Sequence, residues 1–104
     1  MMTALRALAE PRRLEILRLL KKGEMSAGDI AARFRVTRPA ISQHLTVLRG
    51  AGLIAEKRDG TRRLYRIRPA GLDGLREFLE DFWDRGLSRL KRASETAAPS
   101  GRRR

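Results

Sequence analysis

The residues best suited to chemistry lie together in one short stretch. It reads Thr-Arg-Pro-Ala-Ile-Ser-Gln-His-Leu-Thr-Val-Leu-Arg from Thr37 to Arg49, and places a hydroxyl, an amide and an imidazole in succession at Ser42, Gln43 and His44. A serine beside a histidine becomes a nucleophile when a carboxylate orients the imidazole, and the stretch contains no acidic residue. These side chains are therefore better suited to hydrogen bonding than to covalent catalysis, and we expect no enzymatic activity.

Metal and thiol chemistry are also disfavoured. The sequence contains no cysteine, which excludes disulfides, thiolate metal sites and a cysteine nucleophile. His44 is the only histidine, and a single histidine is a weak basis for a metal site. We expect neither a metal nor a cofactor.

The stretch must lie on a helix for its polar residues to act together. Thr37 is suited to the N-cap and Pro39 to the first turn, while Ile41, Leu45 and Leu48 recur at the spacing of one buried stripe. The remaining face lacks Glu, Asp and Lys, the usual residues of a solvated helix surface, and is flanked by arginines. Short neutral hydrogen-bonding groups beside arginines favour a surface that reads base edges next to phosphates. An ordinary amphipathic helix is the simpler alternative.

The distribution of charge supports a nucleic-acid partner. The 104-residue chain has a formal net charge of +12, and residues 33–68 contain ten basic residues against two acidic ones. A generally basic composition would spread this excess evenly, whereas a localised excess is typical of a surface that contacts a polyanion.

The elements around the stretch predict a mainly α fold with a small β-hairpin. Apolar spacing predicts helices near residues 3–9, 11–22 and 26–34, so the helix from Thr37 completes a helix-turn-helix. Leu53–Arg58 and Arg62–Ile67 read as strands around an Asp-Gly type I′ turn. We interpret this hairpin as a wing that contacts phosphate or a minor groove, although its charges could simply protect a sheet edge. Its candidate contacts are Arg58, Arg62, Arg63 and Tyr65.

A terminal helix is predicted from Leu72 to about Lys91. Its apolar stripe is rich in aromatic residues, and the other helices of so small a domain offer little surface to cover it. Packing on the same domain is the simpler interpretation, but we expect a homodimer in which the terminal helices and the N-terminal helix form the interface. The candidate interface residues are Leu5, Leu8, Leu75, Phe78, Leu79, Phe82 and Trp83.

Length and hydropathy predict one domain in residues 1–92 and a basic, disordered tail in residues 93–104. No apolar run reaches membrane-spanning length, and the first residues lack the features of a signal peptide. We therefore expect a cytoplasmic protein without a membrane partner.

This order of elements resembles the ArsR/SmtB family of winged helix-turn-helix repressors. The resemblance extends over about residues 4–90 and rests on residues 8–17, 26–34, 37–54 and 58–67. It implies a dimeric transcriptional repressor whose recognition helices enter successive major grooves of double-stranded DNA at an inverted repeat. Metal-sensing members carry cysteines on the helix matching residues 27–34, or acids and histidines on the terminal helix. This chain has neither set, and so resembles the metal-independent members, similar to sporulation-type autorepressors.

The resemblance, together with the polar outer face of the helix from Thr37, predicts which residues of the recognition helix contact DNA. Arg38 and Gln43 are expected to read bases, and Thr37 and Ser42 to bond a base edge or a phosphate. The full candidate set is Thr37, Arg38, Pro39, Ser42, Gln43, His44 and Thr46, in which His44 serves as a flanking DNA contact or a packing contact. An architectural DNA-coating protein and a winged-helix protein-interaction module are the alternatives. The sequence does not identify an effector.

Overall fold

The computed structural model describes the backbone of residues 1–97, and the side chains of residues 1–87 and 89–93. The chain forms two compact units, one spanning Met1–Asp73 and the other beginning at Gly74. We call the first the winged unit and the second the terminal unit. None of the helices described within residues 1–97 is both long and apolar enough to cross a bilayer.

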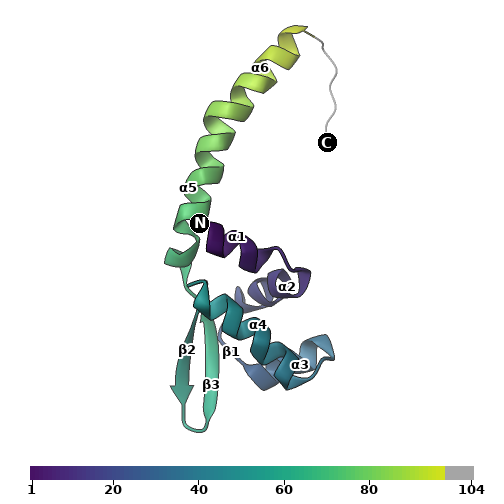
Figure 1. Ribbon diagram of the computed structural model, residues 1–104, viewed down its shortest axis with the longest axis vertical. Helices are drawn as coiled ribbons and strands as arrows, with labels where there is room; N and C mark the ends of the chain where they lie inside the picture. Colours follow the sequence, from purple (N-terminus) through teal and green to yellow (C-terminus); the bar gives the residue numbers. More distant parts are fainter. Residues whose placement is uncertain (98–104) are drawn as a thin grey trace. The chain divides into compact units, whose positions relative to one another are not determined.

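The winged unit contains the predicted helices and hairpin (Figure 1). Its elements, in chain order, are α1 (Met2–Leu8), α2 (Pro11–Leu20), β1 (Met25–Ser26), α3 (Ala27–Phe34), α4 (Arg38–Gly50), β2 (Ile54–Asp59), β3 (Arg62–Ile67) and the 3-10 turn η1 (Pro69–Leu72).

The helices pack around one apolar core in the winged unit. Helix α4 packs against α2 and α3, and it contributes Ile41, Leu45 and Leu48, each at most 1% exposed. Ile16 of α2 and Ile30 of α3 are fully buried beside them. The predicted stripe of α4 is therefore confirmed as a core face, which leaves its other side to solvent.

A tight turn joins α3 to α4. Arg35 adopts the left-handed conformation with φ of 55°, which reverses the chain directly after α3. Val36 donates its backbone N–H to the carbonyl of Ala31 at 3.4 Å. The helix-turn-helix predicted from the sequence is thus present.

The sheet differs from the prediction in two ways. It has three antiparallel strands in the order β1-β3-β2, because Met25–Ser26 forms a short strand beside β3. No alternation of apolar and polar residues predicted this strand. Asp59 pairs with Arg62, so Gly60 and Thr61 form the turn. The predicted type I′ turn centred on Asp59 and Gly60 is wrong: that turn needs positive φ at both central residues, and only Gly60, at 67°, has it.

Close packing follows the hairpin at Gly71. A Cβ atom at this position would lie 1.9 Å from the carbonyl oxygen of Gly52, a distance that no side chain tolerates. The absence of a side chain at Gly71 therefore lets η1 pack directly against the turn that joins α4 to β2.

The terminal helix continues through α5 (Asp73–Asp81), a π-helical segment η2 (Phe82–Leu87) and α6 (Ser88–Ala97). Helix α6 extends past residue 92, where the sequence analysis placed the start of a disordered tail. Residues 93–97 of the predicted tail have helical backbone, and residues 98–104 lie outside the described part of the chain.

Candidate nucleic-acid interface

Helix α4 presents polar side chains on its exposed side. The hydroxyl of Thr37 caps the helix by accepting a hydrogen bond from the N–H of Ala40 at 3.3 Å. The Thr46 hydroxyl donates to the carbonyl of Ser42 at 2.9 Å, so its proton is already used within the helix. The side chains of Ser42 and Gln43 are exposed and make no hydrogen bond within the described residues. These two side chains keep their donors and acceptors available for a ligand.

Arg38 and Pro39 form the exposed first turn of α4. The Arg38 guanidinium lies beside α3, where a Cβ atom added at Gly28 would be 3.8 Å from its Nε. Within the described part of the chain Arg38 has no ion pair. Its charge is therefore not compensated by a protein carboxylate.

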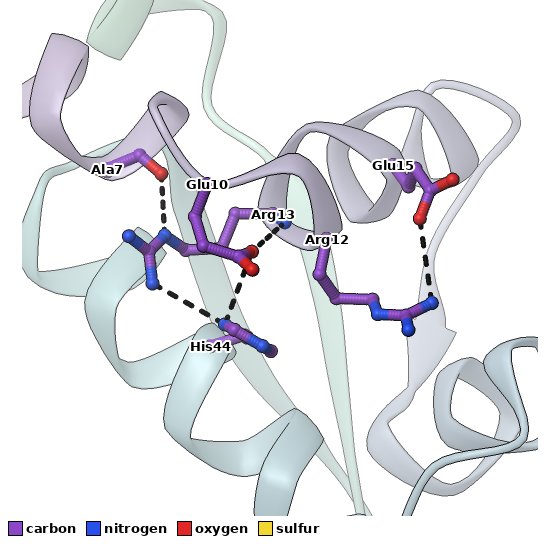
Figure 2. Close-up of polar contacts among 6 residues, drawn as sticks. All are labelled: Ala7, Glu10, Arg12, Arg13, Glu15 and His44. Carbon is purple, nitrogen blue, oxygen red and sulfur yellow. Dashed lines mark hydrogen bonds and ion pairs between the residues drawn. The ribbon is translucent and has the colours of Figure 1, made fainter.

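His44 lies on a different side of α4, toward α1 and α2 (Figure 2). Its Nδ1 atom is 3.4 Å from Nη1 of Arg13 and 4.0 Å from Oε1 of Glu10. Arg13 also donates from Nε to the Ala7 carbonyl at 2.6 Å. The half-buried imidazole thus occupies the packing position that the sequence analysis held as its alternative to a DNA contact.

The wing arginines differ in their partners. Arg62 is 3.6 Å from the carboxylate of Asp29 on α3, and Arg63 is 3.2 Å from that of Glu56 on β2. Glu56 also bonds Arg49 at the end of α4. Arg58 is exposed and forms no ion pair among the described residues. These contacts join the wing to both helices of the helix-turn-helix.

Tyr65 does not share the exposure of the wing arginines. It is 9% exposed and belongs to the apolar core, and it lies on β3, the central strand, opposite Met25 of β1. Tyr65 was predicted, with the wing arginines, to contact the DNA backbone. Tyr65 nevertheless lines a surface cavity shared by α4 and the wing, so the two predicted contact regions meet in one place.

Comparison with known proteins agrees with this geometry. Residues 10–56, which span α2 to β2, match the family described as "Bacterial regulatory protein, arsR family". The HTH-type transcriptional regulator Rv2034 of Mycobacterium tuberculosis is 44% identical over 82% of this chain and 79% of its own length. The chain belongs to the ArsR family.

Two further relatives extend the comparison of this ArsR-family regulator. The transcriptional repressor SdpR of Bacillus subtilis is 37% identical over 78% of the chain and 90% of its own length. The solution structure of a homodimeric winged helix-turn-helix DNA-binding domain from Mycobacterium bovis has a TM-score of 0.66 and 33% identity, covering 85% of this chain and 82% of that one. The winged helix-turn-helix is therefore the architecture of this ArsR-family chain.

The terminal unit of the ArsR-family chain exposes a stripe of apolar side chains. Phe78, Leu79 and Phe82 are each about half exposed, and Trp83 is 66% exposed. The rings of Phe78 and Phe82 stack with centroids 5.9 Å apart. Leu75, also in the terminal unit, is half-buried. We call these five residues the apolar stripe.

The two N-terminal candidates for the interface lie in the winged unit. Leu5 of α1 is 38% exposed, while Leu8 is half-buried and packs against the core. The surface of α1 thus remains apolar at Leu5 but is largely used for folding at Leu8.

Glu56, which forms ion pairs with Arg49 and Arg63, was not among the predicted site residues. Residues 33–68 contain ten basic residues and two acidic ones, of which Glu56 is one. An acidic residue surrounded by so many basic ones was the sequence signal for an ion pair. The strand register sets Glu56 opposite Tyr65, two residues along β3 from Arg63. Its carboxylate pairs there with Arg63 and with Arg49 of α4. Among the described residues, no group of three His, Cys, Asp or Glu side chains converges on a possible metal position.

Proposed function

We propose that this ArsR-family regulator is a cytoplasmic, homodimeric repressor that binds an inverted-repeat DNA operator. The observation that carries the proposal is the exposed face of α4, where Ser42 and Gln43 keep their hydrogen-bonding groups available. The repressor SdpR is a relative, which supports a repressive role.

The side chains of α4 that face away from the core would contact the base edges. Gln43 can bond the N6 and N7 atoms of adenine in bidentate fashion, and Ser42 can bond a neighbouring base edge or phosphate. Thr37 and Pro39 would lie where the helix enters the major groove. Thr46, further along the helix, would offer its hydroxyl oxygen as a hydrogen-bond acceptor. Arg58 and Arg62 hold the wing on the sugar-phosphate backbone.

Dimerisation follows from the apolar stripe. A second copy of this chain would cover the stripe, and the structure of the homodimeric M. bovis domain supports this arrangement. Leu5 and Leu8 of α1 stay proposed contacts between the two copies, and Leu5 is the more exposed of the two. Sedimentation that gives a monomer at micromolar concentration would instead favour a different protein as the partner of the stripe.

The decisive experiment is selection of bound sequences from a random DNA pool by the full chain. We expect an inverted repeat, because two copies related by a two-fold axis read two half-sites. Gln43→Ala should lose about 1 to 3 kcal/mol of discrimination at one base pair per half-site. Arg58→Ala, as the matched variant, should weaken selected and scrambled sites equally.

The strong local charge gives one competing function. Ten basic residues in residues 33–68 would also suit an architectural protein that coats DNA without choosing sequence. Equal affinity for the selected and scrambled sites at physiological salt would establish that function and overturn ours.

A further inference from the structure

A cavity of about 400 Å³ lies where three elements of the winged unit meet. The start of α3 forms one wall, the start of α4 the second and the wing the third. Its principal lining residues are Ser26, Gly28, Arg38, Ser42, Arg62 and Tyr65.

The cavity is electropositive. Arg38, Arg62 and Arg63 all line it, and only the last two have a carboxylate partner among the described residues. Gly28 has no side chain, which lets the Arg38 guanidinium lie against the first turn of α3, with Cζ 3.9 Å from the position of an added Cβ. This is the positive end of the helix dipole. Asp29 in the same turn pairs with Arg62, so Arg38 is left beside that end without a carboxylate partner and can attract an anionic ligand.

Tyr65 adds an independent sign of a ligand. This residue lines the cavity and is nine-tenths buried, and its hydroxyl makes no hydrogen bond within the described part of the chain. Buried tyrosine hydroxyls normally find a partner, since an unsatisfied polar group in the interior is costly. An acceptor oxygen bound in the cavity would supply that partner.

We infer that this cavity binds one phosphate group of the DNA backbone, with Arg38 as its main ligand. A guanidinium can hold two phosphate oxygens at once, and the Tyr65 hydroxyl can donate to one of them. The volume exceeds that of a phosphate and leaves room for the adjoining sugar. The inference rests on the proposed function, and it changes the role of Arg38 from the predicted base reader to a phosphate ligand.

A duplex is the source of phosphate that the position favours. The cavity lies between the recognition helix and the wing, the two elements that the proposed function places along DNA. A strand that passes from one to the other must cross it. A small phosphorylated molecule shares the same chemistry and is the alternative source that the experiment separates.

The test uses the full chain and DNA in which single phosphates are replaced, one at a time, by neutral methylphosphonates. For the unmodified protein we expect one position per half-site where the replacement weakens binding about tenfold or more. Arg38→Ala should weaken binding to all sequences and lower the salt slope by about 0.9 per protomer. It should also abolish the effect of the replacement at that one position.

Two further variants separate the cavity from its surroundings. Tyr65→Phe keeps the ring in the core and removes only the hydroxyl, so we expect about three- to tenfold weaker binding and a smaller effect at the same phosphate. Arg66→Ala is the matched control: this exposed arginine follows Tyr65 on β3 and points to the opposite face. It should leave the effect at that phosphate unchanged.

The outcomes distinguish the inference from the function on which it rests. If Arg38→Ala relaxes preference at one base pair and stays sensitive to every methylphosphonate, Arg38 reads bases and the inference is overturned while the proposed function stands. If the selected DNA is not preferred over scrambled DNA, the proposed function fails first. Competition by millimolar inorganic phosphate or a nucleoside monophosphate, lost in Arg38→Ala and with no sensitive DNA phosphate, would assign the cavity to a small molecule and overturn the DNA inference.

Discussion

The two units of the chain differ in how far their apolar side chains are exposed to solvent. In the winged unit Ile16, Ile30 and Ile41 are completely buried, whereas in the terminal unit Phe78 and Phe82 remain about half exposed. Both patterns come from the same helical spacing of apolar residues. The difference shows that the winged unit completes its core within one chain, while the terminal unit presents an apolar surface that a second chain can cover.

The largest expected effect is in the core of the winged unit. Leu45→Ala should lower the free energy of unfolding by about 2 to 5 kcal/mol, because Leu45 is 1% exposed and its removal leaves a cavity. Urea denaturation followed by circular dichroism measures the change. Val47→Ala, on the same helix at 42% exposure, should change stability by only about 0.5 kcal/mol or less. Equal losses for the two variants would contradict the assignment of one buried face to α4.

A smaller effect is expected in the apolar stripe. Phe82→Ala should weaken the dimer by roughly 1 to 2 kcal/mol per protomer, since about half of this side chain is still available for burial. Sedimentation equilibrium over a range of protein concentrations measures it. The control Glu77→Ala changes an exposed residue of the same helix and should leave the association constant unchanged. A dimer that survives Phe82→Ala at full strength would place the interface elsewhere.

The smallest effect on stability is expected at the contact between the wing and α4. Glu56→Gln removes the carboxylate shared by Arg49 and Arg63, whose side chains are about half exposed, so the cost should be below about 1 kcal/mol. The same change raises the positive charge of the surface and should strengthen DNA binding at low salt and steepen its salt dependence. Weaker binding in a salt titration would show instead that Glu56 holds Arg63 in its binding position.

The helices were predictable because their apolar spacing is strong and local. Ile41, Leu45 and Leu48 indicate the buried face of α4, and Ser42 and Gln43 are among the residues outside it. Caps at Ser26 and Thr37 were predictable for the same reason, since a cap depends on a residue and the N–H three positions later.

The hairpin was predictable only in part. An Asp-Gly pair correctly indicated a turn, but the pairing of Asp59 with Arg62 moved the turn by one residue. Strand β1 has two residues, too few to show any alternation, and its existence depends on β3. Tyr65 was predicted as a contact of the wing, and the structure buries all but 9% of it.

The sequence by itself determined the helix-turn-helix, the location of the positive charge and the exposed polar face of α4, because each depends on residues close together in the chain. Tertiary structure alone decided the contacts between distant residues: Arg38 against Gly28, His44 with Arg13, and Glu56 between two arginines. It also decided that Arg38 and Tyr65 line one cavity. Such contacts depend on strand register and helix packing, which local spacing does not specify.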